Sequence, residues 1–320
     1  MKVLNLTTLE ESEIKYKISP YPDGQQNIIL NKDDCLDGEF ILTHKDCIVK
    51  IKSRLNNFQD LELIICTTKS LRNLGVREIH LYTPYFLGSR SDRRFEEGSC
   101  NYLKDIICPI INSLNFESVT VLDPHSYVLE ACLNNFKKID NRNLVGFAIK
   151  NIYDFDRRVN FEDYFTLMSP DAGATHKIYK VAEQADYKGS IITCSKERDE
   201  NGKLTKVDIP KFDISKDIII IDDICDGGQT FINIAEKINS TRDCLKHLAK
   251  SNKVDIGKLY LIVTHGIFSK GFDELSKYFD GIYCTNSYND LEDYNLEFGD
   301  TSFSRQQEFL ENKIKQLNVF

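Results

Sequence analysis

The fold is decided by the stretch Asp217–Thr230, which reads DIIIIDDICDGGQT. Four consecutive isoleucines with no polar alternation predict a strand that is buried on both faces, as in a parallel sheet covered by helices. Two carboxylates end this strand, a Gly-rich turn follows, and Phe231–Ile238 has helical spacing. The stretch therefore predicts a strand–turn–helix unit of an α/β protein.

The same stretch carries groups suited to a phosphorylated sugar. Backbone N–H groups of the turn from Asp226 to Thr230, together with the helix dipole, attract a phosphate. The carboxylates of Asp222 and Asp223 can accept ribose hydroxyls or position Mg²⁺. The alternative is an ordinary strand–turn–helix unit whose acidic residues lie at a solvated strand end.

Composition limits the classes of protein to consider. The chain has 320 residues, is 41% hydrophobic and 28% charged, and has a net charge of −8, so we expect a globular protein of two domains that binds no nucleic acid. No apolar run approaches the roughly 20 residues that span a membrane. Residues 1–8 are too polar for a secretory signal, and ten scattered cysteines without a Cys-x-x-Cys pair predict free thiols, no zinc site and a cytoplasmic location.

Strand-like and helical runs alternate along the chain, which favours an α/β fold. Leu61–Cys66 fits either an apolar strand or a helix end. After the strand-like run Glu78–Phe86 come Arg90, Asp92 and Arg93. Arginine offers planar pairs of donors that suit phosphate oxygens, although an exposed charged loop remains the alternative.

Two further segments of the first half carry polar groups at turns. The run Ser118–Leu122 leads into Asp123 and His125, and a lone histidine is more often structural than functional. Pro22-Asp23-Gly24, flanked by Tyr21 and Gln25, is typical of a hairpin turn.

The second half repeats the pattern of a strand that ends in polar chemistry. Residues 163–174 predict a strand, an acid at Asp171, a turn through Ala172 and Gly173, and a helix from about Thr175. Asp171 can hold Mg²⁺, and the small residues allow backbone N–H groups to approach a pyrophosphate. A plain strand–helix turn is the alternative.

Lys196 and Arg198 follow the strand-like run Ile191–Thr193, and residues 199–203 are typical of a mobile hairpin tip. A mobile cationic arm can neutralise charge that develops in a transition state and can exclude water. A solvated charged turn is the alternative.

Taken in order, these segments resemble the motifs of the ribose-phosphate pyrophosphokinase (PRPP synthetase) family, which has the type I phosphoribosyltransferase fold. The resemblance covers most of the chain. It rests on Tyr21 and Asp23, Pro84-Tyr85 with Arg90-x-Asp92-Arg93, Asp123-x-His125, Ser169-Pro170-Asp171-x-Gly173, Lys196-x-Arg198, Asp222-Asp223 and Thr264-His265-Gly266. Gln25 stands where the family has Glu, and Ser91 where it has Gln.

The resemblance implies two similar α/β domains, 1–145 and 146–320, each a parallel sheet flanked by helices, with the active site between them. The boundary is set near residue 145 because residues 141–143 are a polar break. Residues 304–317 are expected to form a polar helix that packs back on the first domain.

The resemblance also implies the reaction: transfer of the β,γ-diphosphoryl group of MgATP to the C1 hydroxyl of ribose 5-phosphate, giving PRPP and AMP. The implied sites are catalytic Lys196 and Arg198; ATP-binding Tyr21, Asp23, Gln25, Arg90, Asp92 and Arg93; metal-binding His125 and Asp171; the pyrophosphate loop Asp171, Ala172 and Gly173; and the ribose-phosphate site Asp222, Asp223, Asp226, Gly227, Gly228, Gln229 and Thr230. In that family the segment at Tyr21 reaches a neighbouring subunit's ATP site, which implies a homo-oligomer.

Gly227 and Gln229 depart from the family's usual loop, so a second acceptor is considered. A loop altered in this way could admit a diester, and ADP-ribose, which carries the same C1 hydroxyl, is an acceptor used by relatives in NAD⁺ reconstitution. Two other classes stay open: a phosphoribosyltransferase, which has no need of the arginines or of Lys196-x-Arg198, and a non-catalytic regulatory relative.

Overall fold

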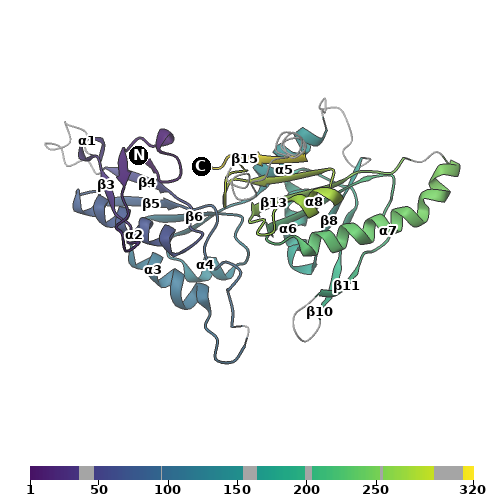
Figure 1. The fold of residues 1–320 in the computed structure, drawn as a ribbon, viewed down its shortest axis with the longest axis horizontal. Helices are drawn as coiled ribbons and strands as arrows, with labels where there is room; N and C mark the ends of the chain where they lie inside the picture. The colour runs from purple at the N-terminus through teal and green to yellow at the C-terminus, as the bar shows by residue number, and fades with distance from the viewer. Residues whose placement is uncertain (36–46, 95, 154–163, 199–203, 253–254, 292–312) are drawn as a thin grey trace. The chain divides into compact units, whose positions relative to one another are not determined.

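The computed structural model describes residues 1–35, 47–94, 96–153, 164–198, 204–252, 255–291 and 313–320 (Figure 1). The chain forms two compact units. Unit 1 is Met1–Asp140 with Val319–Phe320, and unit 2 is Asn141–Asn318. The expected boundary near residue 145 lies inside helix α5 (Arg142–Ile152), which occupies the polar break.

Unit 1 is built on a five-stranded parallel sheet within the described residues. Its strands, in spatial order, are β1 (Lys2–Asn5), β4 (Ile48–Lys52), β5 (Glu78–Tyr82), β6 (Ser118–Leu122) and β7 (Phe136–Ile139). The other elements described there are η1 (Leu9–Glu11), β2 (Tyr16–Ile18), β3 (Ile28–Leu30), α1 (Lys32–Cys35), α2 (Phe58–Asn73), η2 (Leu103–Ile107), α3 (Cys108–Ser113) and α4 (Val128–Cys132).

Helix α2 settles the open interpretation of residues 61–66, because they lie in its interior. Asn57 caps the helix, since its side-chain oxygen accepts the backbone N–H groups of Gln59 and Asp60 at 2.8 and 3.0 Å. Leu61 and Ile64 are buried in the core of unit 1. The strand alternative for this run is therefore wrong.

Unit 2 is built on a six-stranded parallel sheet, again counted over the described residues. In spatial order its strands are β15 (Ile314–Leu317), β14 (Gly281–Thr285), β13 (Leu259–Gly266), β12 (Asp217–Cys225), β8 (Phe165–Ser169) and β9 (Ile191–Thr193). The remaining described elements are α5, α6 (Ala172–Gln184), β10 (Ser195–Arg198), β11 (Leu204–Asp208), α7 (Gln229–Asn252) and α8 (Asp273–Tyr278).

Strand β12 is buried on both faces, as its isoleucines predict. Ile219 and Ile221 belong to a core cluster with residues of α5 and α6. Ile218 and Ile220 belong to a second cluster with residues of α7 and α8. Successive side chains of a strand point to opposite faces, so an unbroken apolar run is what a sheet between two helical layers requires. The prediction of two α/β domains with parallel sheets flanked by helices is confirmed.

Two expected helix positions are corrected. Helix α6 begins at Ala172, not near Thr175, because Asp171 caps it. In the expected tail helix, residues 304–312 lie outside the described residues, and Ile314–Leu317 is strand β15, paired in parallel with β14. An available sheet edge here outweighs helix propensity. Only Val319 and Phe320 join unit 1, where the Tyr82 hydroxyl donates to the Val319 carbonyl at 2.9 Å.

Two expectations from composition, on the cysteines and on membrane-spanning segments, can be compared with the structure. All ten cysteines are free thiols. Among the helices of the described residues, none combines the length and apolar character needed to cross a bilayer.

Candidate functional site

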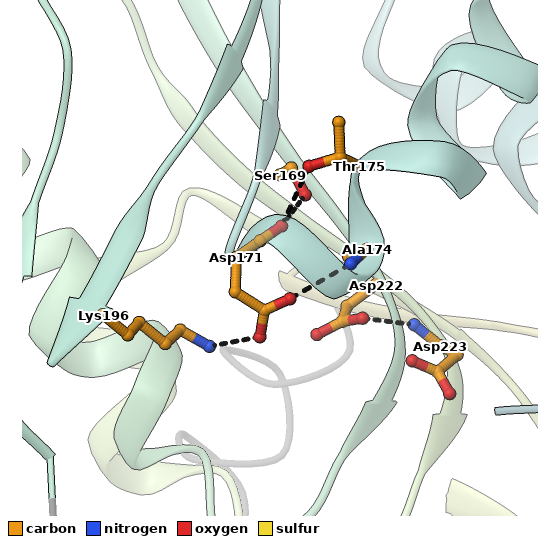
Figure 2. Close-up of polar contacts among 7 residues, drawn as sticks. All are labelled: Ser169, Asp171, Ala174, Thr175, Lys196, Asp222 and Asp223. Atoms are coloured by element: carbon orange, nitrogen blue, oxygen red, sulfur yellow. Dashed lines mark hydrogen bonds and ion pairs between the residues drawn. The ribbon is translucent and has the colours of Figure 1, made fainter. Parts of the chain in front are cut away.

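Asp222 and Asp223 are adjacent residues near the carboxyl end of β12, which continues to Cys225 and does not end at the acids as expected (Figure 2). The backbone N–H of Asp223 donates to Asp222 Oδ1 at 2.9 Å. Burial, together with the negative charge of Asp223, raises the pKa of Asp222 well above its ordinary value. A cation or a hydroxyl donor bound at this pair would relieve the repulsion, so the pair is suited to ribose hydroxyls or to a metal ion.

Lys177 of α6 pairs with Asp223, and sequence analysis did not identify it. Its Nζ lies 3.3 Å from Asp223 Oδ2, and the two side chains are 17% and 7% exposed. The signal in the sequence is that Lys177 stands about two helical turns after Asp171. That spacing alone does not show which acid the lysine meets, because Asp223 is distant in the chain.

Asp171 is held by both of its carboxylate oxygens (Figure 2). Its Oδ1 accepts the backbone N–H of Ala174 at 3.0 Å, and its Oδ2 pairs with Lys196 Nζ at 2.9 Å. Burial alone would raise the pKa of Asp171, but the hydrogen bond and charge of Lys196, with backbone N–H groups of the turn, hold that pKa below its ordinary value. Asp171 is thus both the cap of α6 and the partner of a proposed catalytic lysine.

Ala172 and Gly173 are exposed and lie in the first turn of α6, so the expected turn through them before the helix is wrong. A Cβ on Gly173 would lie 3.2 Å from Asp171 Oδ1, so a side chain there would crowd the carboxylate. The hydroxyls of Ser169 and Thr175 both donate to the carbonyl of Asp171, at 2.6 and 3.1 Å. The start of the helix therefore has a defined backbone shape, and its first two residues carry only a methyl group and a hydrogen as side chains.

Lys196 and Arg198 follow strand β9, as predicted, and themselves lie in a further strand, β10. This strand pairs antiparallel with β11, so the arm is a hairpin, and its expected tip at residues 199–203 lies outside the described residues. The Lys196 side chain is 10% exposed and reaches the turn before α6, whereas Arg198 is described only by its backbone, paired with Leu204. The structure thus brings Lys196 to Asp171.

The turn of Asp226, Gly227 and Gly228 leads directly into α7, whose first residues are Gln229 and Thr230. Gly228 has φ +76°, a left-handed conformation that favours glycine, and Leu275 would lie 3.0 Å from a Cβ placed there. The carbonyl of Gly228 accepts the N–H groups of Phe231 and Ile232, both at 3.0 Å. Thr230 stands in the first turn of the helix. The turn therefore has the backbone form of a phosphate-binding loop.

Gln229, the residue that departs from the family's usual loop, interacts along the helix. Its side-chain Nε2 donates to Asn233 Oδ1 at 2.7 Å, and Gln229 is exposed. The amide is therefore engaged one turn into α7. This geometry weakens the argument that Gln229 reshapes the loop for a diester.

In unit 1 the loop after β5 is tied to the loop after β6. The Ser126 hydroxyl donates to Asp92 Oδ2 at 2.5 Å, next to His125 in the chain. Arg90, Arg93 and His125 are exposed, and Asp92 is half-buried. Four predicted residues from two motifs that lie more than thirty positions apart are thus held in adjoining loops.

Tyr21, Asp23 and Gln25 lie at the turn between β2 and β3, as the hairpin interpretation predicts. The backbone N–H of Gln25 donates to Asp23 Oδ1 at 3.2 Å, and Gly24 donates to the Tyr21 carbonyl at 2.9 Å. All three side chains are exposed. They stand at the tip of the hairpin.

The acidic groups fit a metal that binds mostly through its substrate. Over the part of the chain that the structure describes, no three or more His, Cys, Asp or Glu side chains form a metal-binding group. Mg²⁺ usually keeps several waters and binds through one or two carboxylates plus substrate phosphates. Asp171, whose side chain is 40% exposed, and the Asp222–Asp223 pair offer the hard oxygen ligands that this mode needs.

Comparison with known proteins identifies several relatives that have the same name. No protein-family model matches the chain. The chain is 30% identical over 222 residues to a ribose-phosphate pyrophosphokinase of Saccharolobus solfataricus, covering 68% of this chain and 69% of that protein. It is 29% identical over 273 residues to that of Sulfurisphaera tokodaii, covering 83% and 80%, and 27% identical over 273 residues to that of Mycoplasmopsis pulmonis, covering 82% and 78%.

A solved structure shares the fold. The crystal structure of phosphoribosylpyrophosphate synthetase from Mycobacterium smegmatis aligns over all of this chain and 95% of that one, with a TM-score of 0.71. Because the identity is 13%, this similarity concerns the fold alone.

Proposed function

The chain belongs to the ribose-phosphate pyrophosphokinase family of transferases, and on this premise we propose that it transfers the β,γ-diphosphoryl group of MgATP to the C1 hydroxyl of ribose 5-phosphate. One observation carries the proposal. The start of α6, the acid pair in the last residues of β12 and the turn before α7 all lie at the carboxyl ends of β8 and β12, which are parallel neighbours. Ligands of open parallel sheets bind at that edge.

Each element has a role in this reaction. Backbone N–H groups of the turn from Asp226 to Thr230 bind the 5-phosphate, and Asp222 and Asp223 orient the ribose hydroxyls. The segment Asp171–Gly173, at the N-terminus of α6, receives the diphosphoryl group. The C1 oxygen gives up its proton to solvent and bonds to the β-phosphorus of ATP, while the bond from that phosphorus to the oxygen bridging the α-phosphate breaks, so that AMP leaves.

Lys196 and Arg198 stabilise the charge that develops on the transferring phosphoryl groups. In the structure Lys196 is paired with Asp171 at 2.9 Å, so its ammonium is held next to the proposed diphosphoryl turn. Phosphoryl transfer depends on positioning and charge neutralisation more than on covalent catalysis. Bound Mg²⁺ would supply neutralisation of the triphosphate, and we propose Asp171 and His125 each as a metal ligand of its own unit.

Unit 1 supplies the nucleotide contacts in this proposal. Arg90, Asp92 and Arg93 bind ATP from the loop that Ser126 ties to the loop of His125. The exposed hairpin tip with Tyr21, Asp23 and Gln25 completes the ATP site of a second copy of the chain. An active monomer, detected by mass measurement under assay conditions, would contradict this part.

The test is a direct assay. Purified protein with MgATP and ribose 5-phosphate is expected to release AMP and PRPP in equal amounts. AMP release with ADP-ribose but not with ribose 5-phosphate would favour the other acceptor. No AMP with either sugar would overturn the proposal, and consumption of PRPP with a base would indicate a phosphoribosyltransferase instead.

A further inference from the structure

The segment between β13 and α8 lies against the phosphate turn. The backbone N–H groups of Ile267 and Phe268 both donate to the Cys225 carbonyl, at 2.9 and 3.1 Å. The Ser269 hydroxyl donates to Asp226 Oδ1 at 2.6 Å. Phe268 is buried with φ +47°. Two elements that are about forty residues apart in sequence are therefore joined at the start of the turn.

Lys270, the next residue, lies over Gly227. Its Cδ and Cε are each 3.4 Å from the position that a Cβ of Gly227 would take. The stem of the lysine therefore packs on the turn at a residue that has no side chain. Its ammonium is one bond beyond Cε, and Lys270 as a whole is exposed. This places a cation beside the backbone proposed to bind the 5-phosphate.

The charges around the turn indicate why a cation there would favour phosphate binding. Asp226 puts a carboxylate at the start of the turn, and that charge opposes a phosphate dianion. The dipole of α7 contributes only about half a positive charge at its N-terminus. A lysine ammonium is a mobile point charge on a flexible stem and can follow a phosphate without demanding a bidentate geometry.

We propose that Lys270 is a specificity-determining residue that binds the 5-phosphate of the acceptor and favours a phosphate monoester dianion over an uncharged sugar. This inference rests on the proposed function, because it concerns the same turn. Sequence analysis did not identify Lys270, since its only relation to Gly227 is through the tertiary fold.

The kinetic test uses Lys270→Ala. We expect its KM for ribose 5-phosphate to rise about fivefold, the scale of one exposed ion pair, while kcat and the KM for ATP stay unchanged. Activity with unphosphorylated ribose should not change. Lys270→Arg should restore most of the affinity.

The matched control is Lys277→Ala. Lys277 is an exposed lysine on α8 that pairs with Glu274 at 2.5 Å, so it samples the loss of a nearby charge without a contact to the turn. Equal KM values in the two alanine variants would overturn the proposal. An equal loss with ribose and ribose 5-phosphate would overturn it as well.

A second measurement separates this proposal from the enzymatic one. Inorganic phosphate is titrated calorimetrically into the wild type and into Lys270→Ala, with no ATP present. We expect weaker phosphate binding in the variant, with a difference that shrinks at high salt. If the wild type releases no AMP but this difference persists, the proposed reaction fails and the role of Lys270 stands. Equal binding, or no binding to either protein, would refute the role of Lys270.

Discussion

Two lysine–aspartate pairs meet at helix α6, and they differ in burial and in what they join. Lys196–Asp171 links the β10–β11 hairpin to the cap of the helix, and its carboxylate is 40% exposed. Lys177–Asp223 links the helix to β12, and its carboxylate is 7% exposed. The first pair includes a proposed catalytic group on a hairpin. The second pair joins a central strand of the sheet to a helix that covers it.

The difference in burial indicates that the Lys196–Asp171 pair can separate during the reaction, whereas the Lys177–Asp223 pair stays closed. For Lys196 to reach a transferring phosphoryl group it has to share or leave Asp171, and the exposure of that carboxylate keeps the exchange inexpensive. Separating Lys177 from Asp223 would leave a buried carboxylate without its cation, which is strongly unfavourable. We therefore expect the first pair to control rate and the second to control stability, and the following changes test that division.

The largest effect is expected from Lys196→Ala. Removing a preorganised charge that stabilises a transition state lowers kcat by about 10²–10³-fold. The unfolding free energy should change little, because the aspartate remains solvated. AMP release and urea unfolding measure the two effects, and Lys188→Ala is the control, since Lys188 is an exposed lysine 3.6 Å from Asp186. A kcat within twofold of the wild type would contradict the assignment.

Lys177→Met should lower the free energy of unfolding more than it lowers kcat. Loss of one partner of a buried ion pair costs about 3 kcal/mol of unfolding free energy. Urea unfolding measures the loss. The double variant Lys177→Met with Asp223→Asn removes both charges and should recover most of the stability while acceptor binding stays impaired. If the double variant is as unstable as the single one, the lysine acts by packing alone.

Asp222→Asn should stabilise the protein by about 1 kcal/mol at neutral pH, at the expense of acceptor binding. The folded-state pKa of Asp222 is raised above its unfolded value of about 3.9, so wild-type stability falls as pH rises from there through the folded pKa. The advantage of the variant should therefore be absent below about pH 4 and appear above it. Unfolding measured across this range would refute the raised pKa if the two proteins ran in parallel.

The smallest effect on stability is expected from Asp171→Asn. Asparagine still caps a helix, so of the contacts that stabilise the fold only the ion pair with Lys196 is lost, at about 0.5 kcal/mol for a partly exposed pair. Because the folded pKa of Asp171 is depressed, this contribution is present above the unfolded pKa of about 3.9 and is lost as pH falls through the folded pKa. Equal stability losses at pH 7 and at pH 2 would contradict the ion-pair origin.

Some features of the site could be predicted because they are local. The acid pair at the end of β12, the turn before α7 and the acid before α6 each follow from a strand that runs into a helix within a dozen residues. Asp171 is a partial exception: the acid was identified, but its role as the helix cap was not, so α6 was expected three residues too late. Lys177 and Lys270 were missed because their partners lie elsewhere in the chain.

By itself the sequence determined the type of fold, since the four isoleucines of β12 require helices on both faces of a parallel sheet, and it identified the family through the order of its motifs. Only the tertiary structure decided which lysine meets which acid, where α6 begins, that residues 314–317 form a strand, and that Lys270 lies over Gly227. The physical reason is the distance along the chain over which each interaction acts. Periodicity and turn chemistry act between neighbours in the chain, whereas ion pairs and sheet edges join residues that only folding brings together.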